Sequence, residues 1–249
     1  MFFFRDARSR AKVGKAWKIA IVATSGSATA AQLLLARDAT QALNLLSYYT
    51  IQSNLLVVAA LLAVLVPARR NSLTEALLRA STFWIIITGT VFLFLLSSVY
   101  RPSGIAGYVN IAHHYATPLA MLVNWALFEE KGKSRSRDAL LWLAYPLGFL
   151  AFSLLRGRID GFYPYWFIDP TKAFPKGMGS YGGVAMVSAG LAAIMLSGGL
   201  AVSAMSRRLA RYARRDASRE GGAPHGPSSD AAAGFEKSGR ASSEEEGVR

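Results

Sequence analysis

The sequence contains no cysteine, only three histidines and few charged residues. Without cysteine, the 249-residue chain has no disulfide, no thiolate metal ligand and no cysteine nucleophile. Three histidines are too few for a histidine-rich metal cluster, so we expect no metal ion and no cofactor. Only 17% of the residues are charged, whereas soluble domains carry about a quarter.

The residues that are present are mainly hydrophobic, and the charged ones are mainly basic. Hydrophobic residues make up 52% of the chain, and the formal net charge is +13. A basic balance alone would suggest a nucleic-acid partner. Combined with so few charges, it favours a protein embedded in lipid with its cations at the membrane edge. We therefore expect membrane lipids as partners and no nucleic acid.

The charges are grouped in bands, and the stretches between them are long and apolar. A helix needs about 20 apolar residues to cross the hydrocarbon core, and the bilayer admits helices because their backbone groups are paired internally. The sequence predicts an all-α bundle of six transmembrane helices in the domain 1–215. The predicted spans are 17–36, 45–66, 77–100, 110–128, 139–156 and 183–205.

The distribution of Lys and Arg predicts the orientation. Nineteen of these cations lie on one side of the predicted membrane: six at the N-terminus up to Lys18, three in 69–79, four in 131–137 and six in 207–219. Six lie on the other side, at or near the odd-numbered loops. The positive-inside rule then places both termini in the cytoplasm of a multi-pass plasma-membrane protein. A competing interpretation is a signal peptide cleaved near Ala28-Thr29-Ala30, but the apolar run continues past that point and cleavage would leave an odd number of spans.

The segment 216–249 has a different composition. It is rich in Gly, Ala, Ser and Glu and has almost no large apolar residue except Phe235. Its formal charge is −3. Such a segment cannot bury enough apolar surface to fold, so we predict a disordered cytoplasmic tail.

Two clusters of polar residues lie inside the predicted spans, where polar groups are costly unless they are paired and are therefore candidates for function. Thr50, Ser53 and Asn54 share one helix face in the second span. In the fourth span, His114 shares a face with Asn110, and His113 is rotated by about 100°.

The two clusters lie at matching depths. Thr50 and His114 are each four or five residues from the outer end of a span that runs in the same direction, or roughly 6–8 Å below it. A neutral histidine that accepts a threonine proton makes the hydroxyl a competent nucleophile. Two alternatives stay open: the polar groups are interhelical hydrogen-bonding contacts, or they bind a ligand without catalysis.

The outer loop 156–182 carries five aromatic residues between 162 and 167. Such a loop is typical of an interfacial aromatic belt. Alternatively it forms a lid over the second and fourth spans, with Arg156, Asp160 or Asp169 contacting a polar part of a substrate.

The sequence lacks the motifs of several other functions. There is no glycine-rich phosphate loop after a strand and no Gly-x-Ser-x-Gly motif around a serine nucleophile. No acidic residue lies in the middle of a predicted span, which disfavours an ion-coupled transporter but leaves a facilitator open.

These motifs resemble a bacterial family of six-span integral membrane proteins, itself distantly similar to the androgen-induced and androgen-dependent TFPI-regulating membrane proteins of animals. The resemblance covers residues 12–206. The motifs that carry it are Tyr49–Asn54, His114–Pro118 with Trp125, Arg156-Gly157 and Tyr163–Asp169.

The resemblance implies an intramembrane hydrolase of fatty acid esters of hydroxy fatty acids, with Thr50 as nucleophile and His114 as base. His113 leaves the choice of histidine open. In this hypothesis Ser53, Asn54 or Asn110 donates to the oxyanion of an acyl-ester substrate. The alternative is a non-catalytic lipid-binding protein or facilitator. The sequence gives no oligomeric state.

Overall fold

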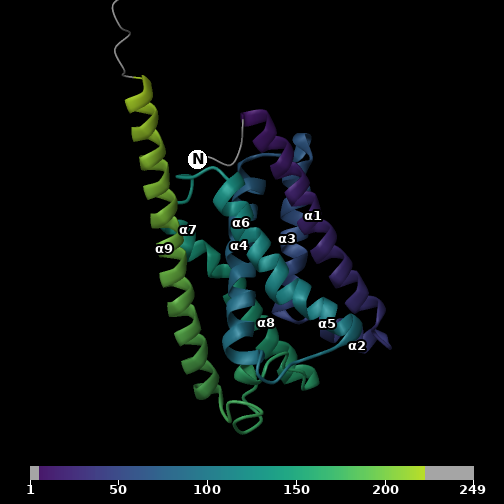
Figure 1. Cartoon of the computed structure of the whole chain (residues 1–249). Coiled ribbons are helices and arrows are strands. Elements are labelled where there is room, and N and C mark those ends of the chain that lie inside the picture. The colour runs from purple at the N-terminus through teal and green to yellow at the C-terminus, as the bar shows by residue number, and fades with distance from the viewer. Residues whose placement is uncertain (1–5, 222–249) are drawn as a thin grey trace, which may run out of the picture. The chain divides into compact units, whose positions relative to one another are not determined.

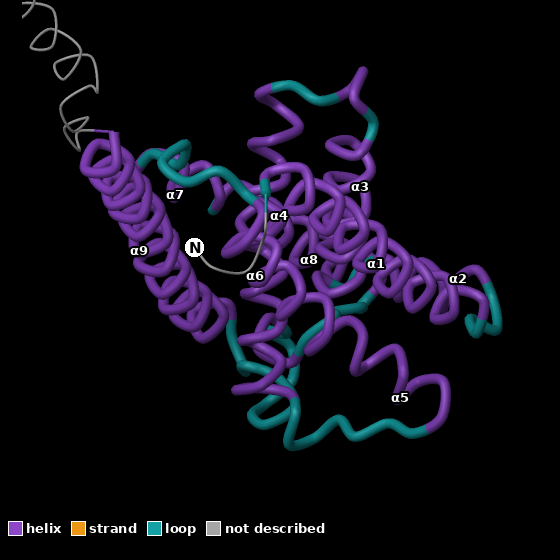
Figure 2. Tube along the Cα trace, turned by 45° about the horizontal axis from the view of Figure 1, so that its top comes forward, coloured by secondary structure: helices purple, strands orange, loops and turns teal. Residues whose placement is uncertain are grey.

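The computed structural model describes residues 6–221, and every regular element among them is helical (Figures 1 and 2). The chain separates into two compact units, Met1–Arg208 and Leu209–Arg249. The core, the candidate site and the cavities discussed below all belong to the first unit.

The helices follow one another with short connections. In chain order they are α1 (Ala7–Leu34), α2 (Ala39–Leu46), α3 (Tyr49–Leu65), η1 (Pro67–Arg69), α4 (Ser72–Val91), the π-helical η2 (Phe92–Leu96), α5 (Gly104–Ile111), the π-helical η3 (Ala112–Ala116), α6 (Thr117–Phe128), α7 (Ser136–Trp142), α8 (Ala144–Asp160), η4 (Trp166–Ile168) and α9 (Tyr181–Gly221).

Local sequence explains where several helices begin and end. The side chain of Asp6 accepts a hydrogen bond from the Ser9 N–H at the start of α1. Asn71 and Thr74 form a reciprocal capping box that starts α4. Helix α8 ends at Gly161, whose φ of 77° lies in the left-handed region that glycine adopts without a steric penalty.

Helices α1, α3, α4 and α6 pack side by side and enclose one core (Figure 1). Its fully buried side chains include Val57 and Leu61 of α3, Ile85 of α4 and Met121 of α6. Helix α4 is the most enclosed of the long apolar helices: 56% of its apolar window is buried, against 17% for those of α7–α8 and α9.

Two smaller apolar clusters attach the later helices to α4. Trp142 stacks on Phe83 with ring centroids 5.1 Å apart, and its carbonyl accepts a hydrogen bond from the Trp84 indole. Phe149 of α8 packs with Phe167 in the loop that follows. Elsewhere α8 and α9 expose large apolar side chains, which suits a lipid environment.

The structure supports a membrane protein with three to four candidate spans. Three helical runs are long and apolar enough to cross a membrane: Ser72–Leu96, Ser136–Asp160 and Tyr181–Arg215. The pair α2 and α3, bent by 72°, becomes a fourth if it is counted as one broken span. The all-α prediction is thus confirmed for the described residues. Three of the six predicted spans have a counterpart by this criterion, or four if the bent α2–α3 pair is one span.

The other two predicted spans, 17–36 and 110–128, fall on helices but not on runs that meet the criterion. Polar residues explain the difference. Helix α1 carries Lys18 at one end of its apolar stretch and Gln32 at the other. The α5–η3–α6 run carries Asn110, His113 and His114. Several of these polar residues line the candidate site described below.

The predicted disordered tail, 216–249, lies outside the described residues except for the segment 216–221. That segment forms the last turns of α9.

Candidate functional site

Thr50 and His114 lie within reach of each other at one end of the bundle. Thr50 is the second residue of α3, and His114 lies in η3. The distance between Thr50 Oγ1 and His114 Nε2 is 3.3 Å. The predicted contact between the Thr50 hydroxyl and a histidine imidazole is therefore present in the structure.

The imidazole of His114 is oriented from two sides. Its Nδ1 lies 3.2 Å from the main-chain carbonyl oxygen of Asn110, which accepts the Nδ1 proton. This contact favours the tautomer in which Nε2 is an acceptor facing Thr50. The ring of Phe92 stacks on the imidazole, with centroids 3.9 Å apart. A hydroxyl, an imidazole and a group that orients the imidazole thus lie in the order found in catalytic triads.

The π-helical turn that carries His114 has a cause in the sequence. Pro118 lacks an N–H and its ring would clash with the carbonyl of His114, four residues earlier, in a regular α-helix. Gly89 of α4 lies against this turn. A Cβ at Gly89 would be 3.0 Å from the His114 carbonyl oxygen and 3.1 Å from Pro118 Cβ. The absence of a side chain at Gly89 therefore lets α4 approach the site closely.

Tyr165, from the loop after α8, is the third side chain at the Thr50 hydroxyl. Its Oη lies 3.3 Å from Thr50 Oγ1 and accepts a hydrogen bond of 3.3 Å from the Thr50 N–H. Burial raises the pKa of Tyr165 to about 12. The phenol is therefore protonated at neutral pH and keeps a proton to donate.

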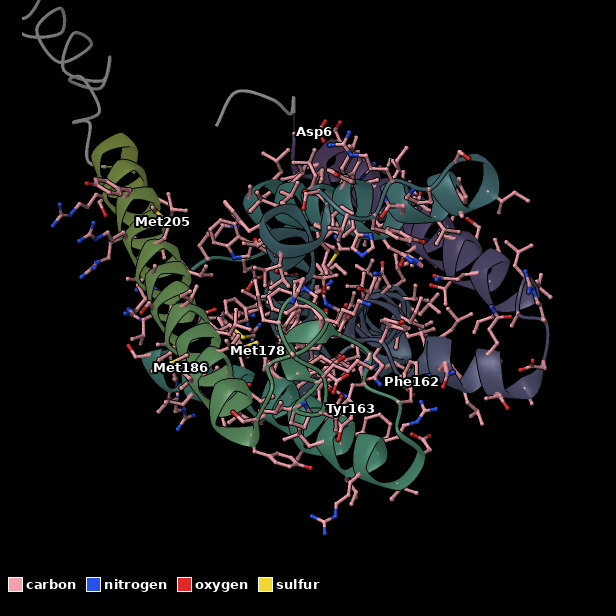
Figure 3. All side chains as sticks on the ribbon, turned by 90° about the horizontal axis from the view of Figure 1, so that it is seen from below. Asp6, Phe162, Tyr163, Met178, Met186 and Met205 are labelled. Carbon is pink, nitrogen blue, oxygen red and sulfur yellow. The ribbon has the colours of Figure 1, made fainter. Side chains whose placement is uncertain are left out.

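Arg156 and Gly157 hold the loop that carries Tyr165. The Arg156 guanidinium donates to the Leu43 carbonyl and to the side chains of Ser47 and Asn44, which ties α8 to the α2–α3 corner. Gly157 receives the Tyr163 ring so closely that a Cβ there would overlap it. Figure 3 shows Tyr163 beside Phe162 on this loop.

His113 takes part in a separate contact. It is 1% exposed, and its Nε2 lies 3.0 Å from Thr29 Oγ1 of α1. Of the two histidines that the sequence left open, only His114 has a hydrogen-bond contact with Thr50 in the described part of the chain.

Ser53 and Asn54, expected as oxyanion donors, lie behind the site. Both are fully buried and both donate to the Thr50 carbonyl. Ser53 also contacts the Thr88 hydroxyl of α4, and Asn54 accepts from Ser25 of α1. In this arrangement they fix the start of α3 between its neighbours, and neither lines a cavity at Thr50.

The three charged residues expected to contact substrate are Arg156, Asp160 and Asp169. They also line neither of the two cavities that meet at Thr50. Arg156 braces the α2–α3 corner and pairs with Asp160 at 2.9 Å. Asp169 is 2% exposed, accepts two hydrogen bonds from Thr171 and pairs with Lys172. Burial raises the pKa of Asp169, but these hydrogen bonds and the Lys172 charge outweigh it and hold the pKa below its usual value.

Two cavities meet at Thr50. The histidine cavity, of about 370 Å³, is lined by Asn110, His113 and His114 among others. The apolar cavity, of about 390 Å³, extends between α4, α8 and α9 and is lined almost entirely by hydrophobic side chains. Four residues line both cavities: Thr50, Phe92, Leu96 and Tyr165. Thr50 therefore lies at the boundary between an almost entirely apolar cavity and one whose lining includes several polar side chains.

The histidine cavity also contains polar atoms without a partner in the protein. The side-chain oxygens of Gln32 and Asn110 are buried, and neither has a hydrogen-bond partner among the described residues. Such atoms require water or a ligand. Asn110 is the one residue of the predicted substrate-binding set that lines this cavity.

Sequence reasoning missed the roles of Tyr165, Phe92 and Gln32. The sequence places Tyr165 among the interfacial aromatics, and its motif, Tyr-Pro-Tyr at 163–165, is the only signal that sets it apart.

Comparison of the chain with protein family models, curated proteins and solved structures found no match.

Proposed function

We propose that this protein is an intramembrane hydrolase of lipid esters, with Thr50 as nucleophile and His114 as general base. The observation that carries the proposal is the 3.3 Å contact between Thr50 Oγ1 and His114 Nε2, with Nδ1 held by the Asn110 carbonyl. A general base must reach the proton that it abstracts directly or through one water, and this pair satisfies that condition.

In the acylation step, Thr50 Oγ1 forms a bond to the ester carbonyl carbon while its proton passes to His114 Nε2. The carbonyl oxygen becomes an oxyanion. The tetrahedral intermediate then collapses, the bond to the alcohol oxygen breaks, and the alcohol leaves with the proton from Nε2. The Asn110 carbonyl, which accepts from Nδ1, stabilises the imidazolium that forms between these steps.

In the deacylation step, a water molecule takes the place of the alcohol. His114 accepts its proton, the hydroxide attacks the acyl-threonine carbonyl, and Thr50 Oγ1 leaves with that proton. The Tyr165 hydroxyl, 3.3 Å from Thr50 Oγ1, is placed to donate a hydrogen bond to the oxyanion in both steps. We propose Tyr165 for this role in place of Ser53 and Asn54, whose donors are used within the bundle.

The two cavities suit the two halves of an ester. An acyl chain would lie in the apolar cavity, and the alcohol part, with its polar atoms, would lie in the histidine cavity beside Gln32 and Asn110. Both volumes fall at the lower end of the range typical of ligand pockets, about 300–1,000 Å³. A branched ester with two chains meeting at one carbonyl would occupy both.

The proposal includes a membrane arrangement and a family. We infer six spans in the plasma membrane with both termini in the cytoplasm, counting α1 and the α5–η3–α6 run as the two polar spans. The cation distribution supports this orientation. The resemblance to the bacterial six-span family and the animal threonine hydrolases supports the same chemistry.

The experiment is hydrolysis of a long-chain p-nitrophenyl ester by the purified protein in detergent. Thr50→Ala and His114→Ala should each reduce the rate to background. Thr82→Ala is the control, since Thr82 is a buried threonine of α4 whose hydroxyl donates to the Leu78 carbonyl of its own helix. Full activity in Thr50→Ala would overturn the proposal.

One observation favours a second candidate, a non-catalytic lipid-binding protein. The contact between Thr50 and His114 joins α3 to η3, and such bonds also serve as interhelical contacts. In that case Thr50→Ala and His114→Ala would both lower the melting temperature by several degrees, and the purified protein would have no esterase activity.

A further inference from the structure

A third cavity lies at the other end of α3. It has a volume of about 780 Å³ and is bordered by the first half of α1, the ends of α3 and α6, and the start of α4. Thr50 and Leu65 mark the two ends of α3. At about 1.5 Å per residue they are roughly 22 Å apart, so this third cavity is separate from the candidate active site. We call it the basic cavity because most of its charged side chains are Lys and Arg.

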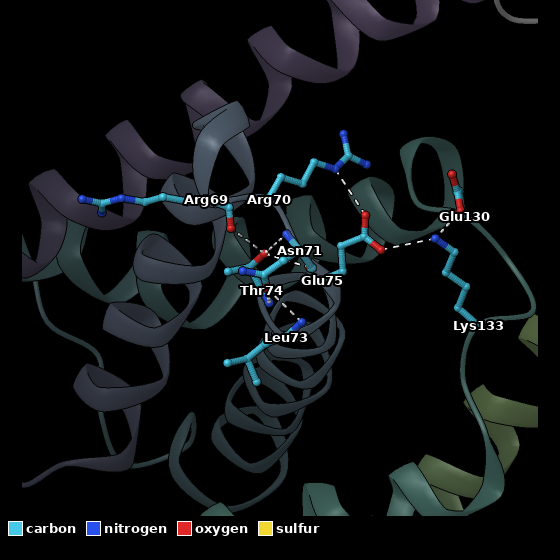
Figure 4. Close-up of polar contacts among 8 residues, drawn as sticks. All are labelled: Arg69, Arg70, Asn71, Leu73, Thr74, Glu75, Glu130 and Lys133. Atoms are coloured by element: carbon cyan, nitrogen blue, oxygen red, sulfur yellow. Dashed lines mark hydrogen bonds and ion pairs between the residues drawn. The ribbon is translucent and has the colours of Figure 1, made fainter.

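The lining of this cavity is rich in charge and predominantly basic. It contains six Lys and Arg side chains and four Asp and Glu side chains. Two of the carboxylates are already neutralised: Glu75 pairs with Arg70 at 3.2 Å and with Lys133 at 3.3 Å, and Lys133 also pairs with Glu130 at 2.6 Å. Figure 4 shows this chain of ion pairs.

The two remaining carboxylates do not balance the remaining cations. Asp6 caps α1 by accepting from the Ser9 N–H. Glu129 accepts a hydrogen bond of 2.9 Å from the Asn124 side chain, and burial raises the pKa of Glu129 despite nearby cations. The lining therefore has a surplus of positive charge that these groups do not remove.

Four cations remain against these two carboxylates, which leaves a surplus of two positive charges. They are Arg10, Lys15, Lys18 and Arg79. Arg10 donates to the Leu127 carbonyl, and Lys18 lies over the Phe128 ring. Lys15 and Arg79 form no hydrogen bond and no ion pair with any residue that the structure describes. Glu129 acts electrostatically on Lys18 and Arg79, but no carboxylate of the described residues forms an ion pair with Lys15, Lys18 or Arg79. Cations gathered in this way around a cavity are suited to bind an anion.

The cavity also has an apolar side. Val64 and Leu65 at the end of α3, Leu78 of α4 and Phe128 of α6 share its lining. Gly14 of α1 packs so closely on the Phe128 ring that a Cβ there would come within 2.9 Å of it. An anion with an attached hydrocarbon part matches this combination better than a small inorganic ion, which would leave the apolar side in water.

We propose that the basic cavity binds the phosphate group of an anionic phospholipid, with Lys15 and Arg79 as its principal cationic contacts. The glycerol and the first acyl carbons pack against Leu65, Leu78 and Phe128. Bound lipid joins α1 to α4 at the end of the bundle opposite Thr50 and stabilises the folded protein. The site does not depend on the hydrolase proposal.

The test is lipid-dependent thermal stability of the purified full-length chain in detergent, with native mass spectrometry to count bound lipid. Phosphatidylglycerol should raise the melting temperature by several degrees and remain bound. Phosphatidylcholine should have a much smaller effect. Lys15→Gln with Arg79→Gln should weaken phosphatidylglycerol binding at least fivefold.

The matched control is Lys12→Gln with Arg69→Gln, which removes the same charge from α1 and from the segment before α4 without altering the cavity lining. The control should keep wild-type lipid binding. Equal losses in both double variants would overturn the proposal, because general surface charge would then explain them. A shift produced fully by inorganic phosphate would assign the site to a soluble phosphate and overturn the lipid assignment.

Discussion

Thr50 has contacts with two side chains that are distant in sequence, and each contact gives its hydroxyl a different property. His114 Nε2 at 3.3 Å provides an acceptor for the proton. Tyr165 Oη at the same distance provides a donor beside the oxygen that we propose as the nucleophile. Ser53 and Asn54 fix the carbonyl of the same residue from behind. In the proposed mechanism, the nucleophilicity of Thr50 therefore depends on groups from three separate segments of the chain.

The first residue-scale prediction concerns Tyr165. Tyr165→Phe keeps the ring but removes the hydroxyl that contacts Thr50. We expect ester hydrolysis to fall about 100-fold, the loss typical of removing one oxyanion donor. The measurement is kcat/KM on the p-nitrophenyl ester, with the melting temperature as a check of folding.

Tyr115→Phe is the control for this change, because Tyr115 is exposed, and among the described residues its hydroxyl makes no hydrogen bond. We expect wild-type activity from it. A Tyr165→Phe enzyme as active as the Tyr115→Phe enzyme would exclude the proposed oxyanion role.

Among the helices, close approach of backbones positions the site. Two glycines allow it: Gly89 lets α4 lie against the turn that carries His114, and Gly157 lets α8 receive the Tyr163 ring. Two π-helical turns, η2 and η3, face each other through Phe92 and His114. Such turns occur often at functional sites because they redirect side chains locally.

Gly89→Ala should move η3 away from α4. The added Cβ would lie 3.0 Å from the His114 carbonyl oxygen, which is too close for backbone to tolerate without a shift. We expect hydrolysis to fall about tenfold or more while the helical content measured by circular dichroism is retained. Gly26→Ala, where a Cβ meets nothing within 4 Å, should leave activity unchanged.

Gly157→Ala should displace the loop that carries Tyr165. Its Cβ would lie 2.2 Å from the Tyr163 ring, so the ring and its loop must move. We expect a loss of stability of about 1–3 kcal/mol, the usual cost of overpacking. Gly148→Ala on the same helix meets nothing within 4 Å and is the control. Equal melting temperatures for the two variants would refute this account of the Arg156-Gly157 motif.

At the scale of the whole molecule, the most apolar helices differ from the helices that carry the polar residues of the histidine cavity. The runs that meet the length and hydropathy criterion for a membrane span include α4, α7–α8 and α9. Helix α1 and the α5–η3–α6 run do not meet it, and they contribute Gln32, Asn110 and His114 to the histidine cavity. The polar residues that lower the hydropathy of these two helical runs are thus the residues that line the candidate site.

The absence of cysteine allows the proposed topology to be tested directly. Single cysteines replacing Ser103 and Ala173 should react with a membrane-impermeant maleimide in intact cells. Cysteines replacing Ser72 and Ser136 should react only after lysis. All four positions are exposed. Labelling of position 72 in intact cells would contradict six spans with cytoplasmic termini.

Periodicity and composition predicted the features that depend on local sequence. The positions of the charge-free runs predicted where helices form. The matching positions of Thr50 and His114 in two spans predicted that these residues could meet. The π-helical turns and the close contact at Gly89 depend on packing between distant segments, which local patterns do not encode. Tyr165 could not be separated from its aromatic neighbours because a belt residue and a site residue look alike in a run of aromatics.

The central claim is that Thr50 acts as a nucleophile activated by His114. The most direct measurement is reaction of the purified protein with a fluorophosphonate, followed by mass spectrometry of its peptides. The account predicts an adduct on Thr50 in the wild-type protein, and no adduct in a His114→Ala variant that keeps its fold. An adduct on another residue, or labelling that persists in Thr50→Ala, would contradict it.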